Sequence, residues 1–364
     1  MKTTFIASAP FEAARHVSIL PEGHKAKRMH GHSFLSSLHV AMPPGIAEYQ
    51  GGEIDTIKTR LVRQVEKLDY QLLNDIIETP TDENIARWIN VHCYVPWTEQ
   101  ISVQSTADQG VRIDMHGMAV VWRRYRFQAA HQLPHVAPGH KCGNMHGHSF
   151  AVLLHATHHI GESHLSIEYD VLDEIWAPVF SQLDHECLNE IPGLANPTSE
   201  MISKWIWERL KPTFDQLSCV TVYETASCGA NYDGSQFEIW KDFSFDSSAK
   251  FAYAPDGNKR AKLHGYTYLL RLRIQGQFDE KMGWAIDFGD VKEAFKPIFK
   301  TIDHQPLWNM DGLSDSDVLS VANYVFGKAR ATLPYLTAME LYESTGNGVT
   351  IGEQTVIALP IQYR

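Results

Sequence analysis

Cysteine is scarce in this 364-residue chain, and its cysteines form neither a CxxC pair nor an even set. The five are Cys93, Cys142, Cys187, Cys219 and Cys228. An odd number of dispersed cysteines does not suggest a disulfide framework, so we expect free thiols in a reducing compartment. This favours a cytoplasmic protein.

Long apolar runs are absent too. Nowhere does the sequence contain the roughly 18 consecutive apolar residues that a membrane-spanning helix needs. The N-terminal stretch MKTTFIASAPFEAARH has one lysine but no sustained apolar core of the kind that a signal peptide carries. We therefore expect no membrane partner.

Basic residues are outnumbered, since 32 Lys and Arg face 43 Asp and Glu, for a formal net charge of -11. Nucleic-acid binding needs a basic face that neutralises phosphates, and no Lys/Arg-rich run is present. We expect no nucleic-acid partner. An anionic small substrate would require a local basic pocket instead.

The sequence repeats itself. Residues 127–150 read FQAAHQLPHVAPGHKCGNMHGHSF, and residues 11–34 align with them without a gap at an offset of 116 (146 minus 30). A fainter copy, at residues 245–266, lies at an offset of 118 (264 minus 146). Later segments keep the same order in each copy, which predicts three units at 1–118, 119–244 and 245–364.

Each unit has the same predicted plan. Apolar residues at helical spacing predict a helix near 172–183 and again near 291–302, and a second helix after Pro197. Two strands precede these helices and two follow them, the latter at 218–225 and 236–240 in the central unit. The fold class is therefore α+β, with three tandem ββααββ units.

The central motif carries metal-binding chemistry. His146 and His148 are two apart on a predicted strand, so both imidazoles point to one face and can share one ion. Spacing alone leaves the third ligand open among His131, His135 and His140. Cys142 lies four residues before His146, where a dication would lower the pKa of the thiol.

The patterns FxAAH and CxxxHGHS resemble the zinc-binding segment of the 6-pyruvoyltetrahydropterin and 6-carboxytetrahydropterin synthase family. The resemblance implies that His131, His146 and His148 bind Zn2+ and that Cys142 is the catalytic base. It also implies a tunnelling fold, in which three units form a twelve-stranded antiparallel barrel with the helices outside. Two such rings stack in the family, so we expect a homodimer of stacked rings.

Other site residues follow from the same resemblance. The pairs Asp184-His185 and Asp303-His304 match the proton relay of the family, and Glu224 and Glu343 match the acid that holds the pterin. By spacing alone an Asp-His dipeptide favours a simple helix-end cap. Family sites form between neighbouring units, and the first unit has Tyr70 in place of the imidazole, so we expect the central zinc site to use Asp303-His304 of the third unit. The remaining option is that Asp184-His185 serves its own unit.

The other two units have lost parts of the motif. In the first unit Arg15, Ala26, Tyr70 and Ser105 stand at the positions of His131, Cys142, His185 and Glu224. In the third unit Ala249, Arg260 and Tyr266 replace His131, Cys142 and His148. We expect one zinc per chain, although His16 or His24 could rescue a second site beside Arg15.

The tracts GHKC, LDHECLNEIPGLANPTSE and KWIWERLKP look like those of bacterial 6-carboxytetrahydropterin synthases. The resemblance implies a zinc-dependent carbon-carbon and carbon-oxygen lyase that converts the small-molecule pterin 7,8-dihydroneopterin triphosphate to 6-carboxy-5,6,7,8-tetrahydropterin for queuosine or deazapurine synthesis.

Two alternatives remain from the sequence. One is a 6-pyruvoyltetrahydropterin synthase, and the other is a catalytically reduced pterin-binding or assembly protein. One departure concerns the IDF motif of the family, which is Ile167-Glu168-Tyr169 in the central unit and Ile286-Asp287-Phe288 in the third. The sequence does not decide which unit forms the pocket wall.

Overall fold

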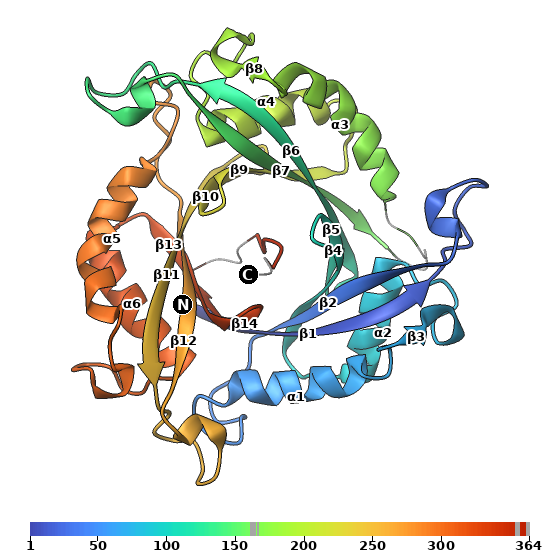
Figure 1. Cartoon of the computed structure of the whole chain (residues 1–364), viewed down its shortest axis with the longest axis vertical. Coiled ribbons are helices and arrows are strands. Elements are labelled where there is room, and N and C mark those ends of the chain that lie inside the picture. The colour runs from blue at the N-terminus through green and yellow to red at the C-terminus, as the bar shows by residue number, and fades with distance from the viewer. Residues whose placement is uncertain (161–164, 166, 354–356, 362–364) are drawn as a thin grey trace.

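The strands close into one antiparallel barrel (Figure 1). The computed structural model describes residues 1–160, 165, 167–353 and 357–361. Of 14 strands in the sheet, β3 (Gln71–Leu72) and β8 (Glu186–Cys187) have two residues each, which leaves twelve in the barrel (14 minus 2). Strand β1 pairs with both β2 and β14, so the first and last units join and the ring closes.

The barrel strands follow chain order around the ring. Their bounds are β1 Lys2–Arg15, β2 His30–Val40, β4 Thr98–Thr106, β5 Gln109–Asp114, β6 Met118–His131, β7 His146–His159, β9 Leu217–Thr225, β10 Cys228–Tyr232, β11 Phe237–Ala249, β12 His264–Ile274, β13 Leu336–Ser344 and β14 Asn347–Gly352.

Six helices cover the outside of the barrel in the described part of the chain (Figure 1). Their bounds are α1 Glu53–Val65, α2 Asp82–Cys93, α3 Tyr169–Leu183, α4 Ser199–Leu210, α5 Phe288–Ile302 and α6 Val318–Thr332. Each helix buries one stripe; in α3 the buried residues include Leu172, Trp176 and Val179. This confirms the α+β class and the three ββααββ units around a closed barrel. None of these helices is long and apolar enough to span a membrane.

Equivalent aromatic pairs occupy the three units. Phe11 stacks on Phe34 at 4.8 Å between ring centroids, Phe127 stacks on Phe150 at 5.0 Å, and Phe245 stacks on Tyr268 at 4.8 Å. All six rings are buried in the core between barrel and helices. The repeat seen in the sequence is therefore a repeat of packing, which holds the first two strands of each unit in the same register.

The sequence interpretation of residues 236–240 as a closing strand of the central unit is wrong. The closing strand is β10, and β11 is one continuous strand that begins at Phe237 and pairs with β12 of the third unit. The turn between them has Gly234 at φ 93°, and Asp233 Oδ1 accepts hydrogen bonds from Ser235 N and Gln236 N. The boundary that we placed between residues 244 and 245 falls within β11.

The short strand β10 was hard to recognise because it begins Cys-Gly-Ala and lacks β-branched residues. Its Gly229 has a packing reason. A Cβ at this position would lie 2.1 Å from the Val222 carbonyl oxygen and 2.5 Å from the Trp240 ring. Glycine is therefore required where the indole of Trp240 crosses the strand.

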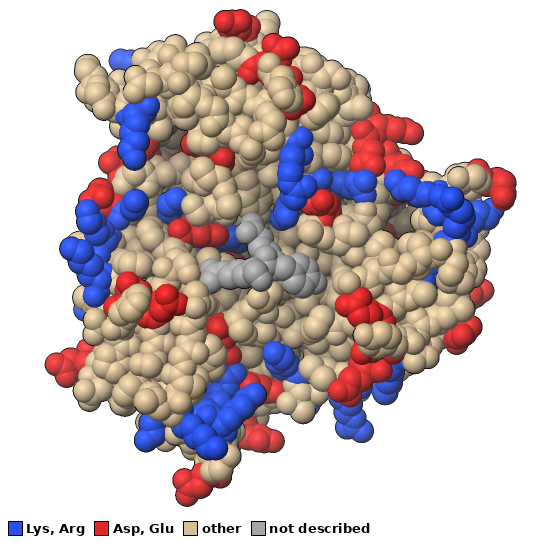
Figure 2. Space-filling view, in the orientation of Figure 1, with Lys and Arg blue, Asp and Glu red and all other residues tan. Residues whose placement is uncertain are grey.

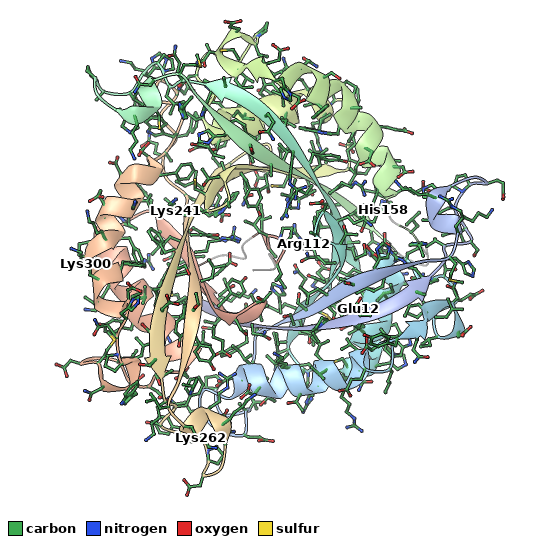
Figure 3. The ribbon with its side chains drawn as sticks, in the orientation of Figure 1. Glu12, Arg112, His158, Lys241, Lys262 and Lys300 are labelled. Carbon is green, nitrogen blue, oxygen red and sulfur yellow. The ribbon has the colours of Figure 1, made fainter. Side chains whose placement is uncertain are left out.

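The inner face of the barrel carries both buried charges and an apolar cluster, and residues 357–361 of the chain lie against it. Arg273 is fully buried, with Glu238 and Glu340 each 2.5 Å away. Its Nη2 also donates to the carbonyl oxygen of Ile357 at 2.9 Å, and Arg112, which points into the lumen (Figure 3), donates to that of Ala358. Leu359 packs in a luminal cluster with Trp122, Leu153, Tyr223 and Trp240. The tail thus contacts strands of all three units.

Candidate metal centre and pocket

Three imidazoles meet where the two long strands of the central unit join. His131 ends β6, His146 begins β7, and the register pairs these two residues directly. The side chains of His131, His146 and His148 each offer one ligand atom, and these atoms lie within 4.8 Å of one another. Among the residues that the structure describes, these three histidines are the one group of at least three possible ligands that could hold a metal ion.

The nitrogen atoms of this group suit a zinc ion. The Nδ1 of His131 lies 2.9 Å from the Pro197 carbonyl oxygen, and that of His146 lies 2.8 Å from the Asn144 carbonyl oxygen. These contacts fix the tautomer, so each Nε2 is free to bind metal. The Nε2 atoms of His131 and His148 are buried and have no hydrogen-bond partner. Burial lowers the pKa of both imidazoles, which keeps them neutral as a metal requires.

Cys142 lies beside this group, in the short 3-10 turn Lys141–Gly143. The ring of His140 caps this turn, because its Nδ1 accepts a hydrogen bond from Cys142 N at 3.2 Å. His140 is thereby occupied, and His135 is exposed. Burial raises the pKa of the Cys142 thiol, and the carboxylates of Glu224 and Asp287 raise it further. A thiolate at this position therefore needs a compensating cation.

A pocket of about 180 Å³ opens beside Cys142. Its walls come from two units, because Trp284, Ile286, Asp287 and Phe288 of the third unit face Cys142 and residues 198–200 of the central unit. The third unit's intact Ile286-Asp287-Phe288, rather than Ile167-Glu168-Tyr169, therefore lines the central pocket.

Two carboxyl groups of the central unit lie in this pocket. Glu224, on β9, has Oε1 3.6 Å from His148 Nε2, and its Oε2 accepts a hydrogen bond from Ser199 Oγ at 3.0 Å. Glu200 is 2% exposed, and burial together with Glu224 and Asp287 raises its pKa to about 8. We missed Glu200 in the sequence because an acid in a first helical turn is ordinarily explained by the helix dipole.

Each Asp-His pair is held by the first strand of its own unit. Asp184 Oδ1 accepts from Gln128 N at 2.9 Å, and Asp303 Oδ1 accepts from Asp246 N at 3.1 Å. The side chains of His185 and His304 are both 76% exposed, and neither lines the pocket of Cys142. By spacing alone we interpreted each Asp-His dipeptide as a helix-end cap. Asp184 and Asp303 do lie at the C-caps of α3 and α5.

The backbone at these positions is unusual. His185 and His304 adopt φ values of 61° and 55°, in the left-handed region that non-glycine residues rarely enter. Tyr70, their counterpart in the first unit, shares this geometry with a φ of 54°. The turn therefore belongs to the fold, and the imidazoles are not needed to form it.

Comparisons with known proteins identify the family of the chain. A family model described as 6-pyruvoyl tetrahydropterin synthase matches three times, at residues 6–107, 120–235 and 238–354. The chain belongs to this family. Over 122 residues it is 36% identical to the 6-carboxy-5,6,7,8-tetrahydropterin synthase of Synechocystis sp., covering 32% of this chain and 93% of that protein.

Two further relatives are similar to parts of this member of the family. The dihydroneopterin monophosphate aldolase of Pyrococcus furiosus is 38% identical over 92 residues, which cover 25% of this chain and 74% of the aldolase. The structure of the 6-pyruvoyl tetrahydropterin synthase of Caenorhabditis elegans is 24% identical, with a TM-score of 0.29, and covers 32% of this chain and 96% of that one.

In the first unit an arginine takes the place of a metal ligand. Arg15 Nη1 donates to the Pro80 carbonyl oxygen at 2.9 Å, as His131 contacts Pro197, and to Asp82 Oδ1 at 2.7 Å. The second oxygen of Asp82 accepts hydrogen bonds from Ser105 and Tyr169, both at 2.7 Å. In the first unit Asp82 therefore stands in place of Ser199, and Ser105 stands in place of Glu224. Both oxygens of the Asp82 carboxylate accept hydrogen bonds from other side chains of the protein.

In the third unit Arg260 stands at the position of Cys142 and ties two units together. Its guanidinium bonds both oxygens of Asp55, on α1 of the first unit, at 2.7 Å, and both oxygens of Glu343 at 2.7 and 2.8 Å. The hydroxyl of Tyr266 accepts another bond at 2.7 Å. Glu343 is therefore committed to Arg260 and does not line the pocket of Cys142.

We expect Arg260→Ala to destabilise the protein strongly. Removing the cation leaves the buried Glu343 without its partner, and breaking one side of a buried ion pair costs about 3–5 kcal/mol. Chemical denaturation should report this loss. Lys259→Ala removes a neighbouring exposed charge and is the control, with a change within about 0.5 kcal/mol. Equal effects of the two substitutions would mean that the Arg260 network adds no stability.

Proposed function

We propose that the chain is a zinc-dependent 6-carboxy-5,6,7,8-tetrahydropterin synthase, a lyase that acts on 7,8-dihydroneopterin triphosphate. The observation that carries this proposal is a group of three imidazoles, one of which lies 3.6 Å from Glu224, a carboxylate that lines the same pocket as Cys142. His131, His146 and His148 would hold one zinc per chain. The first unit has Arg15 in place of a ligand, and the third unit has only His264 of the set.

Each side chain of the pocket has a distinct task in this proposal. The bound zinc supplies Lewis acidity toward the hydroxyl groups of the substrate side chain. Cys142, as the thiolate, removes a proton from that side chain. Glu224 accepts two N–H hydrogen bonds from the amino-pyrimidinone edge of the ring, a pairing that suits a carboxylate anchored by Ser199. Walls from two units exclude water from the ring.

The carboxy product is favoured over the pyruvoyl product by two facts. Cys142 and His146 are separated by three residues, as in the carboxy-type sequences that the chain resembles. The Synechocystis relative with 36% identity is itself named for this activity. Retention of Cys142 and the three imidazoles disfavours a protein that only binds pterin.

The test is a turnover assay with 7,8-dihydroneopterin triphosphate, using protein loaded with zinc and protein treated with a chelator. We expect turnover that requires zinc and that releases acetaldehyde together with triphosphate. Turnover without acetaldehyde would instead indicate the pyruvoyl synthase. Absence of turnover by the zinc-loaded protein, with the ring still bound, would leave the pterin-binding alternative.

A further inference from the structure

The first unit retains an open pocket at the place where the central unit has its candidate active site. This cavity measures about 380 Å³, against about 180 Å³ for the central pocket. It lies between the β1–β2 connection and residues 167–170 of the central unit. Its Lys25, Glu83 and Ile167 are the repeat counterparts of Lys141, Glu200 and Ile286 in the central pocket.

The reactive groups are missing from this first pocket. Ala26 replaces the thiol of Cys142, and Arg15 fills a ligand position. Burial, with the positive charge of Arg15, lowers the pKa of His32 to about 4, so this imidazole is neutral beside a fixed cation. A divalent metal ion would be repelled there. Ser105 also replaces Glu224, and both oxygens of Asp82 are already hydrogen-bonded, so the pocket keeps an open cavity without the metal, the thiol or a free carboxylate.

The other degenerate unit shows a different outcome. There the guanidinium of Arg260 occupies the position of the thiol and bonds Asp55, Glu343 and Tyr266. In the first unit Arg15 turns instead toward Asp82, and the cavity in front of Ala26 stays open. The apolar side chains of Val17, Leu20 and Ile167 line it and offer a surface against which a flat ring can pack.

Basic and acidic side chains both line the first pocket, with Arg15, Lys25, Arg28 and Arg123 beside Asp82, Glu83, Glu168 and Asp170. Arg28 lines the pocket, and its guanidinium has no hydrogen-bond or ion-pair partner among the residues that the structure describes. The Nζ of Lys25 lies 3.5 Å from Asp170 Oδ1 and is 66% exposed. Lys and Arg side chains gather at this corner of the molecule (Figure 2). In the central unit the counterpart of Arg28 is the neutral Asn144 (28 plus 116).

We propose that the first pocket binds a phosphorylated bicyclic heteroaromatic compound without metal and without turnover. The ring lies against the apolar side chains, and the phosphates pair with Arg28 and Lys25. The pterin substrate and purine nucleotides both combine a bicyclic ring with phosphates. The choice of the pterin as a ligand rests on the proposed function. The chain would therefore carry two ligand sites, of which only the central one is catalytic.

The experiment uses the full-length chain with Cys142→Ala, freed of zinc by a chelator, in equilibrium dialysis. One arm contains 7,8-dihydroneopterin triphosphate and the other contains GTP. We expect one phosphorylated ligand to bind at a site that Arg28→Glu weakens at least about 10-fold, because a charge-assisted hydrogen bond is replaced by repulsion. Arg63→Glu, an equal charge change on the exposed face of α1, is the matched control and should leave the affinity unchanged.

A second variant tests the part of the pocket that is proposed to hold the ring. Ala26→Phe places a large side chain in the cavity and should abolish the same binding event, with an unchanged melting temperature as the check on folding. Binding in the pterin arm identifies the substrate as ligand, and binding in the GTP arm alone identifies a purine nucleotide; both support the site. A single site that Glu224→Gln weakens and Arg28→Glu does not, or no binding in either arm, would overturn it. Turnover by the zinc-loaded native chain is measured separately. A failure of the proposed function can therefore be distinguished from a failure of the first pocket to bind a ligand.

Discussion

Cys142→Ala should lower the turnover of 7,8-dihydroneopterin triphosphate by about 10²–10⁴-fold, the range for a positioned acid or base. The zinc content should stay at one per chain, because His131 and His146 keep their contacts to Pro197 and Asn144, and the strand pairing that positions all three imidazoles is unchanged. Burial and two nearby carboxylates raise the pKa of the Cys142 thiol. Its activation thus depends on bound metal. Removing zinc, which also removes the Lewis acid, should therefore lower turnover at least as much as Cys142→Ala does.

The control for this substitution is Cys228→Ala. Cys228 lies in the same pocket on β10, but it is 4% exposed and its Sγ is 3.1 Å from Thr225 Oγ1. Burial raises its pKa too, so it shares the pocket of Cys142 and a raised thiol pKa but lies outside the CxxxHGHS motif. We expect Cys228→Ala to keep turnover within a few fold. If both substitutions have the same small effect, neither thiol is the base.

The parts of the site that lie close together in sequence could be predicted. His131 and His146 are directly paired across two adjacent strands, so a motif of 24 residues (127–150) contains all three imidazoles and Cys142. The repeat of this motif likewise predicted the three units, and the resemblance to the family implied the closed barrel. Such inferences succeed because hairpin register fixes which side chains share a face.

The parts that depend on distant segments could not be predicted. The pocket wall at Trp284 and Asp287 lies more than a unit away from Cys142 in the chain, and the packing of the third unit beside the central unit brings it there. The contact between Arg260 and Asp55 spans 205 residues. The third unit has Arg260 at the position of Cys142, and from the sequence this indicated lost catalysis. The partners through which Arg260 links two units were visible only in the structure.

His185→Ala combined with His304→Ala should lower turnover by about 10²–10⁴-fold while zinc stays bound. The sequence ranks His304 above His185, because the third unit retains this pair after losing its other reactive groups. The structure adds a geometric constraint. Both imidazoles are 76% exposed, both are oriented by a neighbouring aspartate at 2.8 and 3.0 Å, and neither reaches the pocket of Cys142 within the chain.

An exposed, oriented imidazole on a left-handed backbone position is suited to act on a surface that comes from outside the chain. In the expected homodimer of stacked rings, the Asp-His pair of one copy would then complete the pocket of the other. Mixing inactive Cys142→Ala chains with inactive double-histidine chains tests this directly. In mixed dimers one pocket receives an intact Cys142 from one copy and an intact pair from the other.

We expect the mixture to recover activity, up to about one quarter of the native value per chain if subunits exchange at random, since half the dimers are mixed and each has one complete pocket. The single variants His185→Ala and His304→Ala then identify which pair serves the site, with the larger loss for His304. Recovery should follow the fraction of dimer measured by sedimentation. If the double variant is inactive and the mixture of dimers stays inactive, the imidazole acts within its own chain, and the pocket must close around it when substrate binds.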